Sequence, residues 1–149
     1  MGREIERKFL VTSDAWRAGA KGVRIRQGYL SLDPERTVRV RLAGEKAWIT
    51  VKGLSRGPVR DEFEYPIPAA DAVAMLDGLC RASLEKTRHK VRFGGHTWEV
   101  DVFHGRHDGL VMAEIEMAAE GATISMPPWV GKEVTDDPRY YNSNLAQAK

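Results

Sequence analysis

Hydrophobic and polar residues alternate along much of this chain, with the period of two that marks β-strands. The first such stretch, residues 4–11, reads Glu-Ile-Glu-Arg-Lys-Phe-Leu-Val. Further stretches with this pattern lie at residues 23–31, 37–42, 46–52, 61–65, 84–93, 97–103 and 110–117. The stretch at 61–65 is expected to stop at Pro66, because proline cannot donate a ladder hydrogen bond. Eight strands joined mostly by short turns predict an antiparallel sheet or a closed barrel.

Helices have a smaller place in the pattern. A short helix is expected near Ser13 and Asp14, because both are favoured N-cap residues. Within residues 71–79, Val73, Leu76 and Leu79 repeat at helical spacing. The tail, residues 140–149, is expected to form a short closing helix. The predicted fold class is therefore mainly β (α+β), with a few flanking helices.

Charged residues fall on one face of each predicted strand, and most strands carry two of one sign there. The acidic pairs are Glu4 and Glu6, Glu62 and Glu64, Glu99 and Asp101, and Glu114 and Glu116. The basic pairs are Arg24 and Arg26, Arg39 and Arg41, and Lys86 and Arg88, while Lys8 and Lys52 lie on the first and fourth strands. Like charges two residues apart on a strand are about 7 Å from each other. They repel by ~0.6 kcal/mol in water and by ~2.4 kcal/mol at an effective dielectric of about 20. A solvated sheet would mix the signs.

The alternative is an eight-stranded antiparallel β-barrel with its charges inside, forming a charged tunnel. Its apolar outer faces would be covered by helices or by a partner, for example in a homodimer. Such a barrel can hold one small ligand, and buried ions are costly unless they are paired or bound. Carboxylate pairs bind hard cations such as Mg²⁺ or Mn²⁺, and arginine and lysine pairs bind phosphates. Together they indicate a small-molecule polyphosphate bound with its metal ions.

Composition narrows the possible functions. The 149 residues suit one domain, spanning 1–149. A formal net charge of +2 argues against a nucleic-acid domain held by bulk charge. The single Cys80 excludes an internal disulfide and a cysteine-rich zinc site. No stretch approaches the ~18 apolar residues of a membrane span, and the amino terminus has no apolar signal core. A cytoplasmic protein with no membrane partner is expected.

The order of the charged motifs carries a family resemblance. The opening Glu4-Ile5-Glu6-Arg7-Lys8 has the form Glu-x-Glu-x-Lys. Further motifs follow at 27–30, 38–41, 50–53, 62–65, 85–88, 98–101, 113–116 and 131–135, and the last is followed by Tyr140-Tyr141-Asn142. In this order they resemble the CYTH superfamily, the triphosphate tunnel metalloenzymes, over nearly the whole chain. The likeness is greatest to short bacterial members described as inorganic triphosphatases.

The resemblance implies a role for most of the charged residues. It implies metal ligands at Glu4, Glu6, Asp101, Glu114 and Glu116, which would hold two Mg²⁺ or Mn²⁺ ions. It implies phosphate binding by Lys8, Arg39, Arg41, Lys52, Lys86, Arg88 and Lys132. The expected catalytic residues are Glu4, Glu6, Lys8, Lys52, Glu114 and Glu116. The roles of Glu62, Glu64 and Glu99 stay open, and Arg24 and Arg26 are placed near a tunnel mouth.

The implied function is metal-dependent hydrolysis of a phosphoanhydride bond in inorganic tripolyphosphate. One alternative is a class IV adenylate cyclase, which resembles the family in fold and metal site and needs a pocket for adenine. Others are a nucleoside or thiamine triphosphatase and a non-catalytic polyphosphate-binding module. The carboxylates favour catalysis over binding alone, because an anion receptor gains nothing from its own acids.

Two weaker signals favour ordinary structural roles. His104, His107 and Asp108 could suggest a metal site, but a glycine-containing loop surrounds them, and solvated loop residues are the better interpretation. Trp48 could stack on an organic group at a tunnel mouth, but on an alternating strand packing is the simpler expectation.

Overall fold

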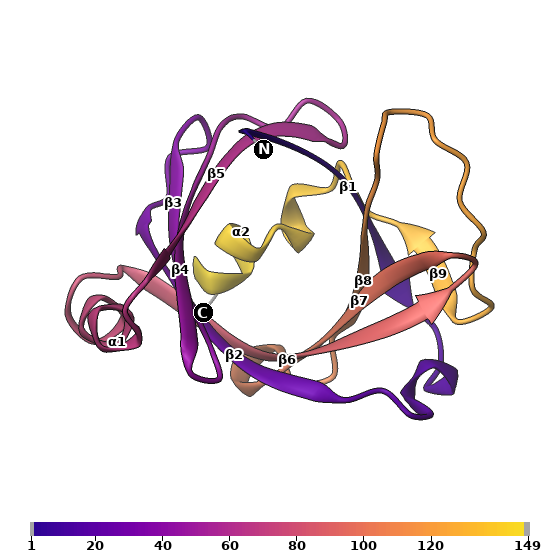
Figure 1. Cartoon of the computed structure of the whole chain (residues 1–149), viewed down its shortest axis with the longest axis horizontal. Coiled ribbons are helices and arrows are strands. Elements are labelled where there is room, and N and C mark those ends of the chain that lie inside the picture. Colours follow the sequence, from indigo (N-terminus) through magenta and orange to yellow (C-terminus); the bar gives the residue numbers. More distant parts are fainter. Residues whose placement is uncertain (1, 148–149) are drawn as a thin grey trace.

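The computed structural model describes residues 2–147, in which nine antiparallel strands form one sheet (Figure 1). The sheet order is β5-β4-β3-β2-β6-β7-β8-β1-β9, and β5 also pairs with β1. That pairing closes β1 to β8 into the predicted eight-stranded barrel, and β9 is an extra strand beside β1. The strands are β1 (Gly2–Val11), β2 (Gly22–Ser31), β3 (Thr37–Ala43), β4 (Lys46–Lys52), β5 (Val59–Ile67), β6 (Ala82–Phe93), β7 (His96–Phe103), β8 (Val111–Glu116) and β9 (Val130–Glu133).

Two strands differ from the prediction. Strand β9 was not predicted, because its four residues are too few to show alternation and it pairs with β1 in an irregular register. Strand β5 does not stop at Pro66, which is paired with Trp48 of β4. Strand β1 pairs only with the first part of β5, as far as Glu62. In the described part of the chain, the edge of β5 that faces β1 is therefore unpaired near Pro66. The missing N–H of proline interrupts no hydrogen-bond ladder there, and proline is tolerated on such an edge.

The predicted helices are present on the outside and at one end of the barrel. Helix α1 (Ala69–Gly78) packs on β3 and β4, and α2 (Asn142–Gln147) lies inside the ring of strands in Figure 1. The helix expected near Ser13 is a single 3₁₀ turn, η1 (Ala15–Arg17). Further 3₁₀ turns are η2 (Gly105–His107) and η3 (Pro138–Tyr140). No helix among residues 2–147 has the length and apolar character to cross a membrane.

The outer faces of the strands are covered unevenly. Trp98 and Val100 of β7 are fully buried in a cluster with Trp16 and Trp129. Helix α1 buries Val40 and Ala47 in a second cluster. Residues 2–147 leave the outer face of β5 without such cover, since Phe63 and Tyr65 are 47% and 58% exposed. The expected covering of apolar faces by elements of the chain therefore holds for β7, β3 and β4 but not for β5.

One end of the lumen is filled by apolar side chains. Leu84, Phe103 and Met112 form a buried cluster with Leu145 and Ala146 of α2. Because β-strand side chains alternate between the two faces, Phe103 shares a face with Asp101, and Met112 shares one with Glu114. The closing helix α2 thus closes one end of the lumen with this apolar cluster, here called the apolar floor. The charged part of the lumen lies on the other side of the floor. Residues 148 and 149 of the predicted tail lie outside the described residues.

Substitution of Gly28 tests the packing of α1 on the barrel. A Cβ atom at Gly28 would lie 2.9 Å from the Cβ and Sγ atoms of Cys80 and from Leu76 Cδ2. We expect Gly28→Ala to lower the free energy of unfolding by about 1–3 kcal/mol, because overpacking a buried contact forces neighbours to shift. Gly78→Ala is the control: nothing lies within 4 Å of the added atom, and a helical position favours alanine by about 1 kcal/mol. Urea unfolding of both variants measures the difference, and equal stabilities would contradict the packing.

Candidate functional site

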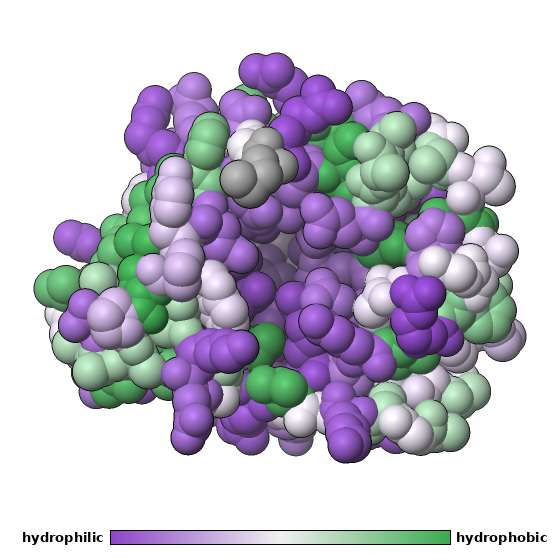
Figure 2. Space-filling view, in the orientation of Figure 1, coloured by the Kyte–Doolittle hydropathy of each residue, from purple (hydrophilic) through white to green (hydrophobic). Residues whose placement is uncertain are grey.

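A hollow in the middle of the barrel gathers most of the charged residues of the inner strand faces. Figure 2 shows it as a hydrophilic depression in the centre of the molecule. Its charged lining consists of Glu4, Glu6, Glu62, Glu64, Glu99, Glu114 and Glu116 together with Lys8, Arg39, Arg41, Lys52, Arg60, Lys86 and Arg88. Acids and bases are equal in number, so the lining is nearly neutral as a whole. What matters is which charges are paired and which are not.

The structure brings all but two of the residues expected at the site into this pocket. The exceptions are Asp101 and Lys132. Lys132 is exposed on β9, which lies beside β1 outside the closed ring of strands. Lys132 does not line the pocket, and its assignment to the phosphate chain stays a prediction.

Asp101 is fully buried, and basic side chains occupy both of its oxygens. Arg88 donates to Oδ1 from Nε and to Oδ2 from Nη2, each at 2.8 Å, and Lys86 Nζ lies 2.7 Å from Oδ2. Burial raises the pKa of Asp101, but Arg88 and Lys86 outweigh it and hold the pKa below its usual value. These contacts make Asp101 the anchor of two cations and leave no oxygen free for the metal expected there.

The other carboxylates crowd one another. Burial raises the pKa of Glu6 well above its usual value, and the charges of Glu114 and Glu4 raise it further. Glu114 is also desolvated, but Lys8, Arg88 and a hydrogen bond from Glu6 keep its pKa low. The pKa values of Glu6 and Glu114 are therefore shifted in opposite directions. Burial and the charge of Glu4 likewise raise the pKa of Glu116.

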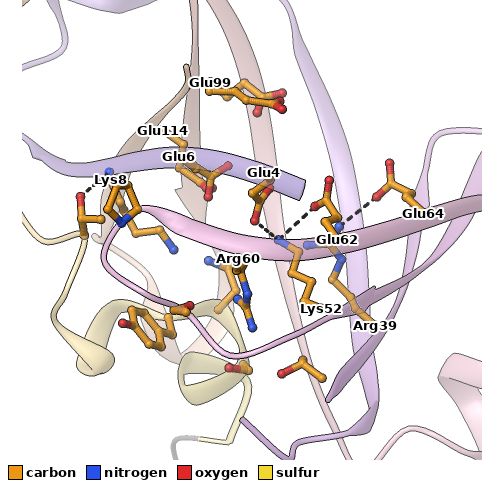
Figure 3. Close-up of a pocket in the computed structure, with 18 of the residues that line it drawn as sticks. Glu4, Glu6, Lys8, Arg39, Lys52, Arg60, Glu62, Glu64, Glu99 and Glu114 are labelled. Atoms are coloured by element: carbon orange, nitrogen blue, oxygen red, sulfur yellow. Dashed lines mark hydrogen bonds and ion pairs between the residues drawn. The ribbon is translucent and has the colours of Figure 1, made fainter. Parts of the chain in front are cut away.

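These carboxylates have the donor chemistry for Mg²⁺ or Mn²⁺, which prefer oxygen ligands. A divalent cation would relieve the repulsion by Glu114 and Glu4 that, together with burial, raises the pKa of Glu6. Within residues 2–147, however, no three Asp, Glu, His or Cys side chains form a ready-made metal site. Lys52 is one reason: its Nζ lies 2.8 Å from Glu4 Oε1 and 3.4 Å from Glu62 Oε2 (Figure 3). The residue types present are suitable metal ligands, but Lys52 would have to release Glu4 before Glu4 could bind a metal.

Arg41 lacks an acidic partner among the described residues, although it lies deep in the barrel. Its Nε donates to Gln27 Oε1 at 3.1 Å. Burial, with the charges of Arg39 and Arg88, lowers the pKa of Arg41 to about 9. A buried guanidinium beside two others is unfavourable unless an anion joins them. Arg39 is better compensated, because Thr50 and Glu64 accept from its Nη2 at 3.2 and 3.3 Å.

Charge alone misassigned the inner face of β2. Arg24 and Arg26 were expected near a tunnel mouth, but they form ion pairs on the outer surface with Glu85 and with Asp77 of α1. The inward residues of β2 are Ile25, Gln27 and Tyr29, which are nearly or fully buried. Their alternation with glycine and arginine was the available signal.

The C-terminal segment contributes a polar residue, Asn142, which lies in the last motif of the resemblance but was given no role in the sequence analysis. Asn142 Oδ1 accepts hydrogen bonds from Lys86 Nζ at 2.7 Å and from Gln27 Nε2 at 3.0 Å. At the other end of α2, Arg106 Nη2 donates to the Ala146 carbonyl at 2.5 Å, and His107 Nε2 lies 2.6 Å from the Leu145 carbonyl. The loop after β7 thus holds the closing helix, and His107 is not the solvated residue expected.

Two other weak signals can now be placed. His104 Nε2 lies 2.7 Å from the Thr87 hydroxyl, so it also has a structural contact instead of free solvation. Trp48 is half-buried opposite Arg41 and does not line the pocket.

Replacement of Asp101 distinguishes an anchor from a metal ligand. We expect Asp101→Asn to lower the free energy of unfolding by about 3–5 kcal/mol even in a metal chelator, because it leaves Lys86 and Arg88 buried without their counter-charge. The control is Glu85→Gln, which removes the exposed ion pair with Arg24 and should change stability by less than about 1 kcal/mol. Chemical denaturation gives both values. Unchanged stability of Asp101→Asn without metal would contradict the anchor.

Known proteins are similar to this chain in sequence and in fold. A protein of Acetivibrio thermocellus named inorganic triphosphatase is 51% identical over 148 residues, which cover 99% of this chain and 95% of the relative. A Nitrosomonas europaea protein of the same name is 35% identical over 147 residues, with 96% of each chain covered. The crystal structure of an inorganic triphosphatase superposes with a TM-score of 0.70 at 34% identity, covering 98% of this chain and 95% of that one.

The family profile agrees with these relatives. The profile of the CYTH domain matches residues 2–143, which include every strand of the barrel and the start of α2. The closed barrel, its charged interior and the matched sequence all point the same way, and the chain belongs to the CYTH domain family.

Proposed function

We propose that this protein is a divalent-metal-dependent hydrolase of inorganic tripolyphosphate and that residues 1–149 act as one domain. The observation that carries the proposal is Arg41, a half-buried guanidinium in the pocket lining that has two cationic neighbours and no acidic partner among residues 2–147. Such a group favours the binding of a polyanion. The crowded carboxylates of the same pocket favour divalent cations, and a metal-bound triphosphate supplies both. The names of the two relatives support the same substrate.

Four carboxylates are proposed as metal ligands. Glu4, Glu6, Glu114 and Glu116 line the pocket. Burial, followed by the charges of neighbouring glutamates, raises the pKa values of Glu6 and Glu116, and a cation would offset that repulsion. Asp101 is omitted, because both of its oxygens are used by Arg88 and Lys86. Two Mg²⁺ or Mn²⁺ ions, when bound, would neutralise phosphate oxygens and lower the pKa of an attacking water.

The basic residues would bind and orient the phosphate chain. The proposed binding residues are Lys8, Arg39, Arg41, Lys52, Lys86 and Arg88. Their fixed positive charges would stabilise the equatorial oxygens of a loose phosphoryl-transfer transition state. Asp101 and Asn142 would hold Lys86 in place through the contacts at 2.7 Å. Lys52 would exchange its contact with Glu4 for a phosphate oxygen, so that substrate binding frees a metal ligand. This scheme needs no side-chain nucleophile.

Product analysis tests the reaction itself. The protein is incubated with tripolyphosphate or ATP, in Mg²⁺, in Mn²⁺ and in a chelator, and the products are separated by ion-exchange chromatography. We expect phosphate and pyrophosphate from tripolyphosphate, only with metal, and no cyclic AMP. Cyclic AMP from ATP would identify a cyclase. Binding without turnover under every condition would leave a polyphosphate-binding module, and either result would contradict the proposal.

A single substitution tests the proposed metal ligands. Glu6→Gln keeps the shape and removes the charge, so we expect kcat/KM on tripolyphosphate to fall by about two orders of magnitude. Excess Mn²⁺ should restore part of the activity by mass action. Glu45→Gln, at an exposed residue between β3 and β4, is the matched control and should behave like the wild type. Circular dichroism verifies that both variants fold. Wild-type activity of Glu6→Gln in a chelator would rule out the metal scheme.

A further inference from the structure

Arg60 is a basic residue of the pocket that the motifs did not assign. It lies on β5 directly across from Glu4 of β1, and its side chain lines the pocket. Its Nε donates to the Gly53 carbonyl at 3.0 Å. In the described part of the chain it has no ion pair and no other side-chain hydrogen bond. Its two terminal nitrogens are therefore free to bind a ligand, while the bond to Gly53 fixes the direction in which they point.

Few other basic groups of the pocket lack an acidic partner. Lys52 pairs with Glu4, Lys86 and Arg88 pair with Asp101, and Arg39 pairs with Glu64. The ion pairs found within residues 2–147 involve neither Lys8 nor Arg41, nor do they involve Arg60. The first two already belong to the proposed phosphate-binding set. Like them, Arg60 has no acidic partner within residues 2–147, so its charge favours an anion. Figure 3 shows Arg60 on the side of the pocket that carries Lys8 and Lys52, away from Glu99.

The two ends of the pocket differ in what they can accept. At the deep end, Lys86 and Gln27 are bonded to Asn142, and the apolar floor lies beneath them. Because the apolar floor closes this end, we place the nucleoside of a bound nucleotide at the other end. At the Arg60 end the walls come from the loop between β4 and β5, through Ser55, Gly57 and Pro58. A nucleoside triphosphate would therefore enter with its free γ-phosphoryl group first, and its esterified α-phosphoryl group would lie towards Arg60.

We propose that Arg60 binds the outer terminal phosphoryl group of tripolyphosphate and thereby gives the site its preference for inorganic over nucleoside triphosphates. This inference rests on the proposed triphosphatase function. Tripolyphosphate presents a terminal group, with three unbridged oxygens and up to two charges, at both ends. In a nucleotide the outer group is esterified, and it carries a single charge on two oxygens. A guanidinium attracts the doubly charged group more strongly and can bind two of its oxygens in parallel.

Kinetics with two substrates test the preference. We expect Arg60→Ala to lower kcat/KM for tripolyphosphate about tenfold to a hundredfold, the range for losing a charge-assisted hydrogen bond, and to lower that for ATP less than about threefold. Arg60→Lys keeps the charge without the planar fork and should fall between Arg60→Ala and the wild type. The matched control is Arg56→Ala, an exposed arginine of the same loop outside the pocket lining, which should leave both values unchanged.

Calorimetric binding of tripolyphosphate in a chelator separates this inference from the proposed function. The inference predicts weaker binding to Arg60→Ala than to the wild type, whether or not the wild type turns over. If the wild type hydrolyses tripolyphosphate but Arg60→Ala loses both substrates equally or neither, the inference is wrong and the triphosphatase stands. If the wild type binds but does not hydrolyse, weakened binding by Arg60→Ala upholds the contact and the catalytic proposal fails. If Arg60→Ala does not fold, Arg60→Lys takes its place. Kinetics and binding of Arg60→Lys equal to those of the wild type would then overturn the inference.

Discussion

The ion-pair network of Asp101 is the contact on which the interior of the barrel depends. Lys86 and Arg88 share one fully buried carboxylate, and Arg88 extends the network to Glu114 at 3.1 Å and to Glu99 at 3.3 Å. Removing two cations from water costs several kcal/mol each unless close counter-charges replace the solvent. The network links β6, β7 and β8 through their inner faces, so the strand register and the charge pattern stabilise each other. Without Asp101 the positive wall of the pocket could not be packed.

Charges left outside this network define what the site can bind. Among residues 2–147 Arg41 has cationic neighbours but no acidic partner, while burial and the charges of Glu114 and Glu4 raise the pKa of Glu6. The pocket thus carries positive charge that lacks an acidic partner and negative charge that is crowded by other carboxylates. Ion pairs within the protein do not compensate either of them. A phosphate chain with bound divalent cations would relieve both at once. The ligand-free site therefore keeps electrostatic repulsion that binding can release, which is a source of affinity that an already neutral lining would lack.

The C-terminal segment couples the closure of the barrel to the chemistry of the pocket. Leu145 packs into the apolar floor, and a few residues earlier Asn142 accepts from Lys86. Arg106 and His107 hold the far end of the same helix through its carbonyls. Lys86 is thus fixed from two sides, by Asp101 and by Asn142, and burial lowers its pKa to about 7. A displaced tail would open the floor and release one partner of a phosphate-binding lysine.

Local sequence determined the strands of the barrel and the inner faces of β1, β3 and β8, because a period of two shows directly which residues share a face. It failed at β2, whose arginines pair outside with Glu85 and Asp77, since charge does not reveal which face is enclosed. Only the tertiary structure decided that Asp101 pairs with cations, that Lys132 lies outside the pocket lining, and that Arg60 and Asn142 enter the pocket. These outcomes depend on strand register and barrel closure, which join residues far apart in the chain, and no local pattern encodes such contacts.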